Sequence, residues 1–449
     1  MRSLTEIRVK SLLGRFNHVI KFPENDEFVI LHGPNGVGKT KVLELIRALA
    51  APLQLHRIAR IPFGAAELLY SDGSVLQVTR NHQESLPLGD GFEKKVRQVA
   101  LKLTFPGVSD SVSWSASFDN GGPSGSPRLR DYVSRMLEIE QVAPDIWEDT
   151  TGTTMTTSEL LDIYGDRLPS SFLRTTQEKK IPAALRNFIM SNDVHLIETQ
   201  RLLGLQNLSG PTARRVGSIK VEEFAKDLSR RLAEALAENS RVSQELDRTY
   251  PTRLLKAQSE YPDEQKIGAR YDEQNRLRRR LAEISLLDEK SGGIVIPEGM
   301  AAWQRNVLWT YLEDSDKKLS TFRYILDRVS LLQEIVNSRF LYKRLEVDRK
   351  RGLKIVTDEG TDLSLSMLSS GEQHELVLLY DLLFNVGPGA LVLIDEPEIS
   401  LHVSWQKRFI DDLRRISALV QFRSIVATHS PQIAGKWIDR MTSLAPESD

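Results

Sequence analysis

The chain contains no cysteine, has almost no net charge and lacks long apolar runs. Without cysteine it cannot form disulfides, bind zinc or iron–sulfur clusters through thiolates, or use a cysteine nucleophile. Its 60 basic and 61 acidic residues give a formal net charge of −1, so any contact with nucleic acid needs a local patch. No run approaches the roughly 18 apolar residues of a membrane span, and the first ten residues contain no signal-peptide core. We therefore expect a cytoplasmic protein without a membrane partner.

The length and overall composition suit a globular protein with several structural units. At 449 residues the chain exceeds one typical domain, and about two or three units are expected. Charged residues make up 27% and apolar residues 40%, which is ordinary for a soluble protein with a substantial core.

A glycine-rich loop follows an apolar strand near the start of the chain. Residues 28–33, FVILHG, read as a short buried strand, and residues 33–40, GPNGVGKT, fit the pattern G-x-x-x-x-G-K-[ST] ahead of a helical pattern. Such glycines turn backbone N–H groups toward nucleotide phosphates, while Lys39 reaches the outer phosphates and Thr40 binds Mg²⁺. We therefore predict ATP and Mg²⁺ as cofactors. The predicted nucleotide contacts in this loop come from Gly33, Asn35, Gly36, Gly38, Lys39 and Thr40.

A serine-glycine motif lies far downstream, where residues 368–373 read LSSGEQ before an apolar helical pattern. Ser369, Gly371 and Glu372 are predicted to contact a nucleotide, because a hydroxyl and free N–H groups at a helix start suit a γ-phosphate. The same residues also suit a simple helix N-cap, since serines precede Glu372 and Gln373. The residues of this motif alone leave both interpretations open.

Two further strands end in polar side chains. Residues 391–402, LVLIDEPEISLH, predict a central strand followed by Asp395, a candidate Mg²⁺ ligand, and by Glu396, a candidate general base. The alternative is a pair of solvated acids at a strand end. Residues 422–431, FRSIVATHSP, predict the next strand, which ends in His429. An isolated histidine is more often structural or exposed, but its place after a strand that follows the acidic one makes His429 a candidate for contact with the γ-phosphate and the attacking water.

The remaining sequence predicts a flanking sheet and a helical insertion. Asp72-Gly73 between two strand patterns predicts a hairpin, and LKLTF and SVSWSASF predict further strands. Residues from about 130 to 190 read as mostly helical. Amphipathic patterns predict helices over 221–246, ending near Pro251, and over 263–287 and 301–340. These helices form either a short coiled-coil-like arm or a bundle on the core. The expected domains are 1–200, with the loop and flanking sheet, 201–340, the helical insertion, and 341–449, with the downstream motifs.

In order, spacing and flanks, these motifs resemble the ABC-type P-loop ATPase heads of the SMC, RecF and OLD-like group, often described as AAA-family ATPases. The resemblance covers about 1–115 and 340–440. It implies an α/β fold with a mixed sheet and an inserted helical arm or bundle, and it implies ATP hydrolysis. By resemblance the catalytic residues are Lys39, Glu396 and His429, and the metal site comprises Thr40, Asp395 and Gln200.

The resemblance also implies a dimer. In this group Ser369 and Gly371 act on the nucleotide of a second subunit, and Ser400 to His402 fall in the loop that crosses the interface. A homodimer or higher homo-oligomer through the ATP sites is therefore expected. Gln200 is the candidate metal-sensing glutamine because it closes a strand just before the helical insertion. Gln98 and Gln141 are alternatives, and Arg201 beside it could instead be the functional group.

The function implied is an ATP-driven switch that regulates or scaffolds a separate effector. OLD-type nucleases continue into a nuclease domain, whereas this chain ends 20 residues after His429, so we expect a nuclease, plausibly of phage defence, to be another polypeptide. DNA is a further candidate partner through the basic clusters 275–280 and 343–351, for which a solvated helix face is the alternative. Two other functions stay open: the nucleotide-binding subunit of an ABC transporter, and a non-catalytic scaffold cemented by ATP.

Overall fold

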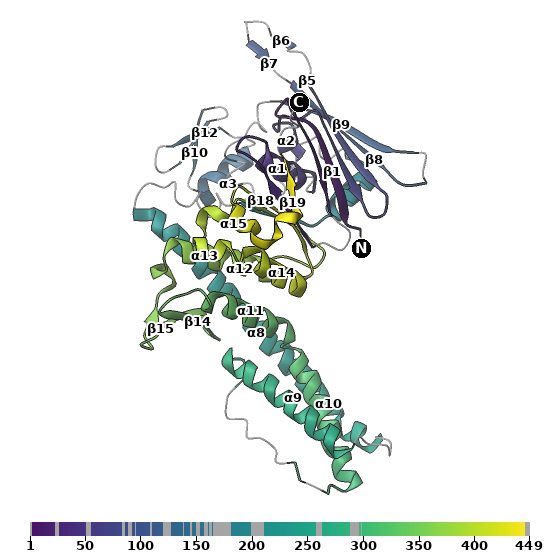
Figure 1. Cartoon of the computed structure of the whole chain (residues 1–449), viewed down its shortest axis with the longest axis vertical. Helices are drawn as coiled ribbons and strands as arrows, with labels where there is room; N and C mark the ends of the chain where they lie inside the picture. Colours follow the sequence, from purple (N-terminus) through teal and green to yellow (C-terminus); the bar gives the residue numbers. More distant parts are fainter. Residues whose placement is uncertain are drawn as a thin grey trace. The chain divides into compact units, whose positions relative to one another are not determined.

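The computed structural model describes residues 2–22, 27–50, 55–82, 86–88, 92–94, 96–107, 110–119, 127–137, 139–143, 146–149, 153–156, 160, 164, 181–198, 211–256, 263–287, 296–297 and 299–444 (Figure 1). The chain divides into two compact units. Unit 1 comprises Met1–Ile197, Gly387–Pro397 and Phe422–Asp449, and unit 2 comprises Glu198–Val386 and Glu398–Gln421. Both units contain helices and sheets, so the predicted α/β class is confirmed.

Unit 1 contains a six-stranded antiparallel sheet of order β2-β1-β4-β5-β8-β9. Its strands are β1 Leu4–Leu12, β2 Phe16–Lys21, β4 Ala65–Tyr70, β5 Val75–His82, β8 Val96–Thr104 and β9 Val112–Asp119. Buried residues alternate with partly exposed ones along β4, as expected for a sheet covered on one face. The hairpin predicted at Asp72-Gly73 is confirmed: Gly73 has φ +78° and the Asp72 carboxylate accepts from Ser74 N at 2.9 Å.

A second, five-stranded sheet of order β13-β17-β18-β3-β19 carries the motifs of unit 1. Its strands are β3 Phe28–His32, β13 Val194–Glu198, β17 Leu391–Asp395, β18 Arg423–Thr428 and β19 Met441–Ser443. Strands β17, β18, β3 and β19 pair in parallel. Their carboxyl ends therefore meet at one edge of the sheet. Helix α1, Lys39–Ala50, buries an apolar face that belongs to the same hydrophobic core as β3 and β18.

The segment predicted as mostly helical, 130–190, is only partly so in its described residues. Besides α3, Pro127–Leu137, and α6, Ala183–Met190, it forms a three-stranded antiparallel sheet. The strands are β10 Glu140–Ala143, β11 Ile146–Glu148 and β12 Thr154–Thr156. β-Branched and aromatic residues favour this outcome, since fully buried Trp147 packs with Met155 and Val133 in a small core of its own. The shorter elements of unit 1 are α2 Leu55–Ile58, β6 Leu86–Leu88, β7 Phe92–Lys94, α15 Pro431–Ala434 and η6 Gly435–Arg440.

Unit 2 holds the helical insertion and the serine-glycine motif. Its helices are α8 Pro211–Lys256, α9 Glu264–Glu283, α10 Ala302–Ser320, α11 Arg323–Asn337, α12 Ser370–Phe384 and α14 Phe409–Val420. The other elements are β14 Lys343–Asp348, β15 Gly352–Thr357, β16 Asp362–Leu363, η4 Leu365–Met367 and α13 Val403–Gln406, preceded by η5 Pro397–Ser400 at the boundary with unit 1. Figure 1 shows α9 and α10 beside the C-terminal part of α8. These three helices form the arm.

Two helix boundaries differ from the sequence prediction. Helix α8 does not end near Pro251 but continues to Lys256. Arg253, two residues after Pro251, donates to Leu246 O at 2.8 Å and pairs with Asp314 of α10, so contacts on both sides of the proline hold this last part of the helix. The helix predicted over 301–340 is two helices, α10 and α11, separated by Thr321 and Phe322. Thr321 is the C-cap of α10, and its hydroxyl donates to Lys318 O at 2.7 Å.

The base of α8 packs directly on α12, the helix that follows the serine-glycine motif. Phe224 of α8 stacks on Tyr380 of α12 with ring centroids 4.5 Å apart. The Tyr380 hydroxyl donates to Asp227 of α8 at 2.7 Å. Gly352, at the start of β15, approaches α8 so closely that a Cβ would lie 1.8 Å from Ala225 O. The arm helix and the motif helix therefore share one packed interface.

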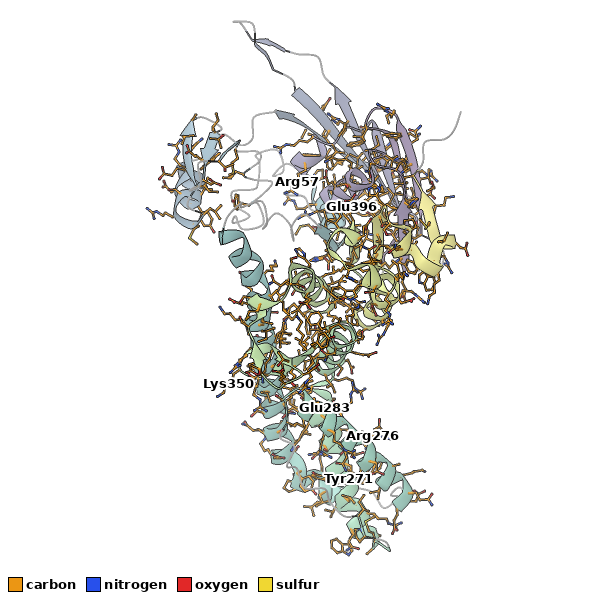
Figure 2. All side chains as sticks on the ribbon, turned by 60° about the vertical axis from the view of Figure 1, so that its left-hand side comes forward. Arg57, Tyr271, Arg276, Glu283, Lys350 and Glu396 are labelled. Carbon is orange, nitrogen blue, oxygen red and sulfur yellow. The ribbon has the colours of Figure 1, made fainter. Side chains whose placement is uncertain are left out.

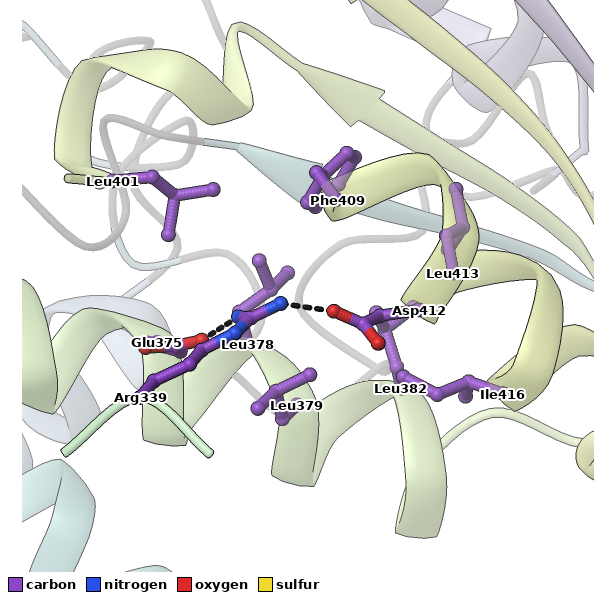
Figure 3. A pocket seen from close by; sticks show the side chains of 10 residues that line it. All are labelled: Arg339, Glu375, Leu378, Leu379, Leu382, Leu401, Phe409, Asp412, Leu413 and Ile416. Atoms are coloured by element: carbon purple, nitrogen blue, oxygen red, sulfur yellow. Dashed lines mark hydrogen bonds and ion pairs between the residues drawn. The ribbon is translucent and has the colours of Figure 1, made fainter. Parts of the chain in front are cut away.

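A buried charged cluster joins α11, α12 and α14 in unit 2 (Figure 3). Arg339, just after α11, forms ion pairs with Glu375 of α12 and Asp412 of α14. Glu375 is only 1% exposed. Burial lowers the pKa of Arg339, and burial raises the pKa of Asp412. Arg339 thus links the three helices through its ion pairs with the two carboxylates.

Candidate functional site

The glycine-rich loop of unit 1 wraps the N-terminus of α1. Gly36 and Gly38 have φ +86° and +93°, a backbone region that favours glycine. At Gly38 a Cβ would also lie 2.5 Å from the Leu12 side chain. Helix α1 begins at once, with Val42 N donating to Gly38 O at 2.9 Å. The loop therefore presents backbone at a helix N-terminus, the arrangement that suits a phosphate.

Lys39 directs its ammonium group into this loop. The side chain is buried, and its Nζ donates to Gly33 O at 2.8 Å and Pro34 O at 3.2 Å. It also lies 3.0 Å from His429 Nδ1, at the end of β18. A buried cation is thus held at the centre of the loop. Asn35 is exposed at its tip.

Thr40 and Asp395 face each other across the ends of α1 and β17. The Thr40 hydroxyl donates to Asp395 Oδ2 at 2.9 Å. Burial raises the pKa of Asp395 to about 6, and the nearby Glu396 charge adds to this, while the hydrogen bond from Thr40 opposes it. Both oxygens are hard donors of the kind that Mg²⁺ takes from a protein when phosphates complete its shell.

Glu396, labelled in Figure 2, occupies a strained backbone position directly after β17. Its φ is +45°, a region that few residues with a Cβ adopt, and its N–H donates to Ala427 O of β18 at 2.8 Å. This fixed turn brings Glu396 Oε1 to 2.8 Å from His429 Nε2. The two ring nitrogens of His429 therefore contact Glu396 on one side and Lys39 on the other.

The structure brings five predicted residues together in unit 1: Lys39, Thr40, Asp395, Glu396 and His429. Gln200 and Arg201 lie outside the described residues. Of the alternatives, Gln98 lies in β8, and Gln141 accepts from Arg130 at 2.8 Å in the small sheet around β10.

The serine-glycine motif belongs to unit 2 and forms the helix cap that its sequence allowed. Ser369 is the N-cap of α12 and shares a capping box with Glu372. Glu372 also pairs with Lys343 at 2.9 Å. Burial favours a higher pKa for Glu372, but Lys343 and the Ser369 hydrogen bonds outweigh it and lower that pKa. Ser369 itself is exposed, so the cap leaves its hydroxyl on the surface.

A buried histidine, missed by the sequence prediction, supports the glycine-rich loop. His18 of β2 is 4% exposed, and its Nε2 lies 2.8 Å from Val37 O, inside the loop. Its ring stacks on Phe16 with centroids 5.9 Å apart. A histidine at a buried position of an alternating strand is the signal that could have revealed it.

Several basic side chains of the two clusters form hydrogen bonds or ion pairs within unit 2. In the first, Arg278 contacts Ser315, and Arg280 lies 3.7 Å from Asp327. In the second, Arg349 donates to Ser285 O and Arg351 pairs with Asp362. Figure 2 labels Arg276 of the first cluster and Lys350 of the second. These pairings favour the interpretation of both clusters as helix and hairpin surface.

Residues 264–434 match a family model described as "AAA domain, putative AbiEii toxin, Type IV TA system". A segment of 103 residues is 35% identical to "Retron Ec83 probable ATPase" of Escherichia coli and covers 20% of this chain and 19% of that protein. Residues 264–434 therefore carry an AAA-type ATPase domain. The predicted kinship with AAA-family ATPases is thereby confirmed.

Other similar proteins share a lower sequence identity with this chain. Protein ea59 of Escherichia phage lambda is 32% identical over 135 residues, which cover 29% of this chain and 24% of that protein. The matched segments thus span about a fifth to a quarter of these curated relatives. Among solved structures, the Smc head domain of Pyrococcus furiosus is 14% identical to this chain, with a TM-score of 0.34. The comparison covers 96% of this chain and 91% of the solved chain.

The site in unit 1 has the donor set for a nucleotide with Mg²⁺. Backbone N–H groups and Lys39 suit phosphates, and Thr40 and Asp395 suit one metal ion. In the described residues no group of three or more histidine or carboxylate side chains could hold a metal by itself. Nor does any helix of the described part have the length and apolarity to cross a bilayer.

Proposed function

We propose that this protein binds and hydrolyses ATP with Mg²⁺ and works as a switch that dimerises through its ATP sites. The observation that carries the proposal is the convergence of Lys39, Thr40, Asp395, Glu396 and His429 at the carboxyl ends of β3, β17 and β18 in unit 1. A cation, a pair of metal-ligand oxygens and a carboxylate–imidazole pair are the parts that phosphoryl transfer to water requires.

Each side chain has a separate role in this proposal. Lys39 exchanges its bonds to Gly33 O and Pro34 O for phosphate oxygens and stabilises their charge. Thr40 and Asp395 hold Mg²⁺, which supplies charge neutralisation on the phosphates. Glu396 accepts a proton from the attacking water, and His429 orients Glu396 through the 2.8 Å contact. Gln200 remains our proposal for the metal-sensing glutamine.

The test of this mechanism is hydrolysis by the full chain and three variants. Lys39→Ala is expected to lose nucleotide binding, whereas Glu396→Gln is expected to retain binding and lose turnover. Lys10→Ala, at an exposed position of β1 in the same unit, removes a lysine outside the proposed site and should retain both binding and turnover. Hydrolysis by Lys39→Ala at the wild-type rate would refute the assignment of this loop.

Dimerisation is supported by exposed side chains in unit 2. Ser369 and Gly371 are proposed to contact the nucleotide of a second copy, together with the loop Ser400 to His402. Met367, two residues before Ser369, is 68% exposed. Ile399 and Val403, which flank that loop, are 54% and 51% exposed. Exposed apolar groups beside polar recognition residues are typical of an interface.

Sedimentation of Glu396→Gln with ATP and Mg²⁺ tests the dimer. A shift to twice the monomer mass is expected, and Ser369→Arg should prevent it because a bulky cation would displace the phosphate. Ser366→Arg, an exposed position three residues earlier, is the matched control. A dimer that forms equally well without nucleotide would contradict closure through the ATP sites.

We further propose that the switch controls a separate effector in phage defence, with a nuclease as the leading candidate. Support comes from the similarity to a retron ATPase over 103 residues. The packing of α8 on α12 offers a route by which changes at the serine-glycine motif reach the arm. Purification from the native operon with mass spectrometry of co-eluting proteins tests this proposal. Recovery of the chain without any operon-encoded partner, with ATP and without it, would contradict a separate effector.

A further inference from the structure

A second cavity of unit 1 lies at the other end of the elements that build the candidate ATP site. It is lined by Ile46, Leu49 and Ala50 at the C-terminal end of α1, by Leu391 at the start of β17 and by Arg423 at the start of β18. The site residues Lys39, Asp395 and His429 lie at the opposite ends of these same three elements. The cavity is therefore distinct from the nucleotide loop.

Arg423 places a partly buried cation in this cavity. Its guanidinium carbon lies 4.0 Å from the centre of the Phe22 ring, and its NH1 donates to Leu4 O at 2.7 Å. Burial lowers the pKa of Arg423. Among the residues that the structure describes, no carboxylate forms an ion pair with it. A half-buried cation without a counter-charge raises the free energy of the folded protein, and a bound anion would offset that cost.

Arg2 adds a second guanidinium to the cavity wall. It lies over the rings of Phe188 and Tyr70, at 3.6 and 5.2 Å from their centres, and donates to Phe188 O at 2.9 Å. Its Nε is buried and lacks a hydrogen-bond partner in the described chain. Asp193 also lines the cavity. The Asp72 carboxylate also interacts electrostatically with Arg2, so Arg423 is the cation of this wall that has no carboxylate partner among the described residues.

The rest of the cavity is apolar and of limited size. Its volume is about 60 Å³, room for a handful of atoms, since one water needs roughly 10–15 Å³. Ile46, Leu49, Leu68 and Leu391 provide an aliphatic surface. Guanidinium groups bind carboxylates and phosphates through paired N–H donors. The combination fits a ligand with one oxyanion and a short aliphatic body.

We propose that this cavity is a binding site for a small molecule that carries a carboxylate or phosphate group on a short apolar chain. The oxyanion contacts Arg423 and Arg2, and the chain lies against the aliphatic side chains at the end of α1. The site does not depend on ATP hydrolysis, so its test is independent of the function proposed above.

Titration calorimetry of the full chain with hexanoate, hexyl phosphate and neutral hexanol tests the proposal. At least one of the two anions should bind saturably. The affinity for hexanol should be lower by a factor of about ten or more, as expected for the loss of a charge-assisted hydrogen bond. Whichever anion binds more tightly identifies the oxyanion. Equal affinity for hexanol, no saturable binding of either anion, or displacement of the anion by ATP would overturn the proposal.

Two variants localise the site. Arg423→Gln should weaken anion binding about tenfold, whereas Arg8→Gln, an exposed arginine of β1 in the same unit, should leave it unchanged. Ala50→Leu keeps every charge and fills the cavity from the end of α1, so it should abolish binding while circular dichroism reports a folded chain. Unchanged affinity in Ala50→Leu would place the anion elsewhere and refute the assignment.

Discussion

Glu396 Oε1 lies 2.8 Å from His429 Nε2, although the two residues come from different strands. The strained φ of +45° at Glu396 and its backbone bond to Ala427 O hold this geometry. Energy stored in such a conformation is usually retained because function depends on the position it creates. The pair is therefore the sharpest point at which to test the proposed chemistry.

Glu396→Gln is expected to reduce the rate of ATP hydrolysis about 100-fold or more, because an amide cannot accept the proton of the attacking water. His429→Ala should reduce the rate by a smaller factor, since it removes the group that orients Glu396. Glu396→Gln should bind ATP as tightly as the wild type in an equilibrium assay. Glu359→Gln, in an exposed turn of unit 2, is the control. Equal rates for Glu396→Gln and wild type would exclude Glu396 as the base.

The raised pKa of Asp395, about 6 instead of 3.8, predicts a pH dependence of Mg²⁺ binding. Only the ionised carboxylate binds the metal, so Mg²⁺-dependent nucleotide affinity should rise about tenfold between pH 5 and pH 7. Calorimetry at several pH values measures this change. An affinity that is flat across this range would show that Asp395 does not hold the metal.

The raised pKa of Asp395 also predicts how the stability of the metal-free protein changes with pH. The unfolded carboxyl loses its proton near pH 3.8 and the folded one near 6, so the stability contributed by neutral Asp395 falls as pH rises between these values. Asp395→Asn should therefore stabilise the metal-free protein at pH 8 by about 3 kcal/mol, because an amide keeps the Thr40 hydrogen bond without a buried charge. Thermal melts in EDTA at pH 4 and pH 8 should show the gain only at pH 8.

Gly352→Ala is expected to destabilise unit 2, because its Cβ would lie 1.8 Å from Ala225 O of α8 and its φ is +75°. The backbone of β15 or α8 would have to move, at a cost of about 3 kcal/mol or more. Gly360→Ala is a matched control, since Gly360 has φ +83° with no atom within 4 Å of the added group. Chemical denaturation should show a larger loss of unfolding free energy for Gly352→Ala than for Gly360→Ala. Similar losses in both would mean that backbone strain, and not the contact with α8, sets the cost.

Motifs that depend on neighbouring residues were accessible from the sequence. The glycines, Lys39 and Thr40 follow one another along a strand, loop and helix, and parallel strands explain why Asp395 and His429 meet them. Contacts made by tertiary packing were not accessible. Nothing local to His18 indicates that its ring bonds Val37 O. Nothing local to Pro251 indicates that α8 continues past it, where Arg253 pairs with Asp314 of α10.

The ion pairs of Arg339 with Glu375 and Asp412 could not be predicted either, because their partners come from three helices. They provide a further test. Arg339→Gln leaves buried Glu375 without its cation and Asp412 with only Arg415, which should destabilise the fold by about 3–5 kcal/mol at pH 8. Burial already raises the pKa of Asp412, and the loss of the Arg339 charge, which opposes this effect, should raise that pKa further. The deficit should therefore shrink as pH falls toward 4 and the carboxyls protonate.

Denaturation of Arg339→Gln and wild type at pH 8 and pH 5 measures this difference. Arg344→Gln, which loses only an exposed pair with Glu346, should change stability by less than about 1 kcal/mol at either pH. A double variant, Arg339→Met with Glu375→Leu, removes a charge pair and should regain much of the loss, because apolar residues of similar volume replace buried ions at little cost. If Arg339→Gln loses the same unfolding free energy at both pH values, lost packing, and not the loss of a cation beside Glu375 and Asp412, causes it.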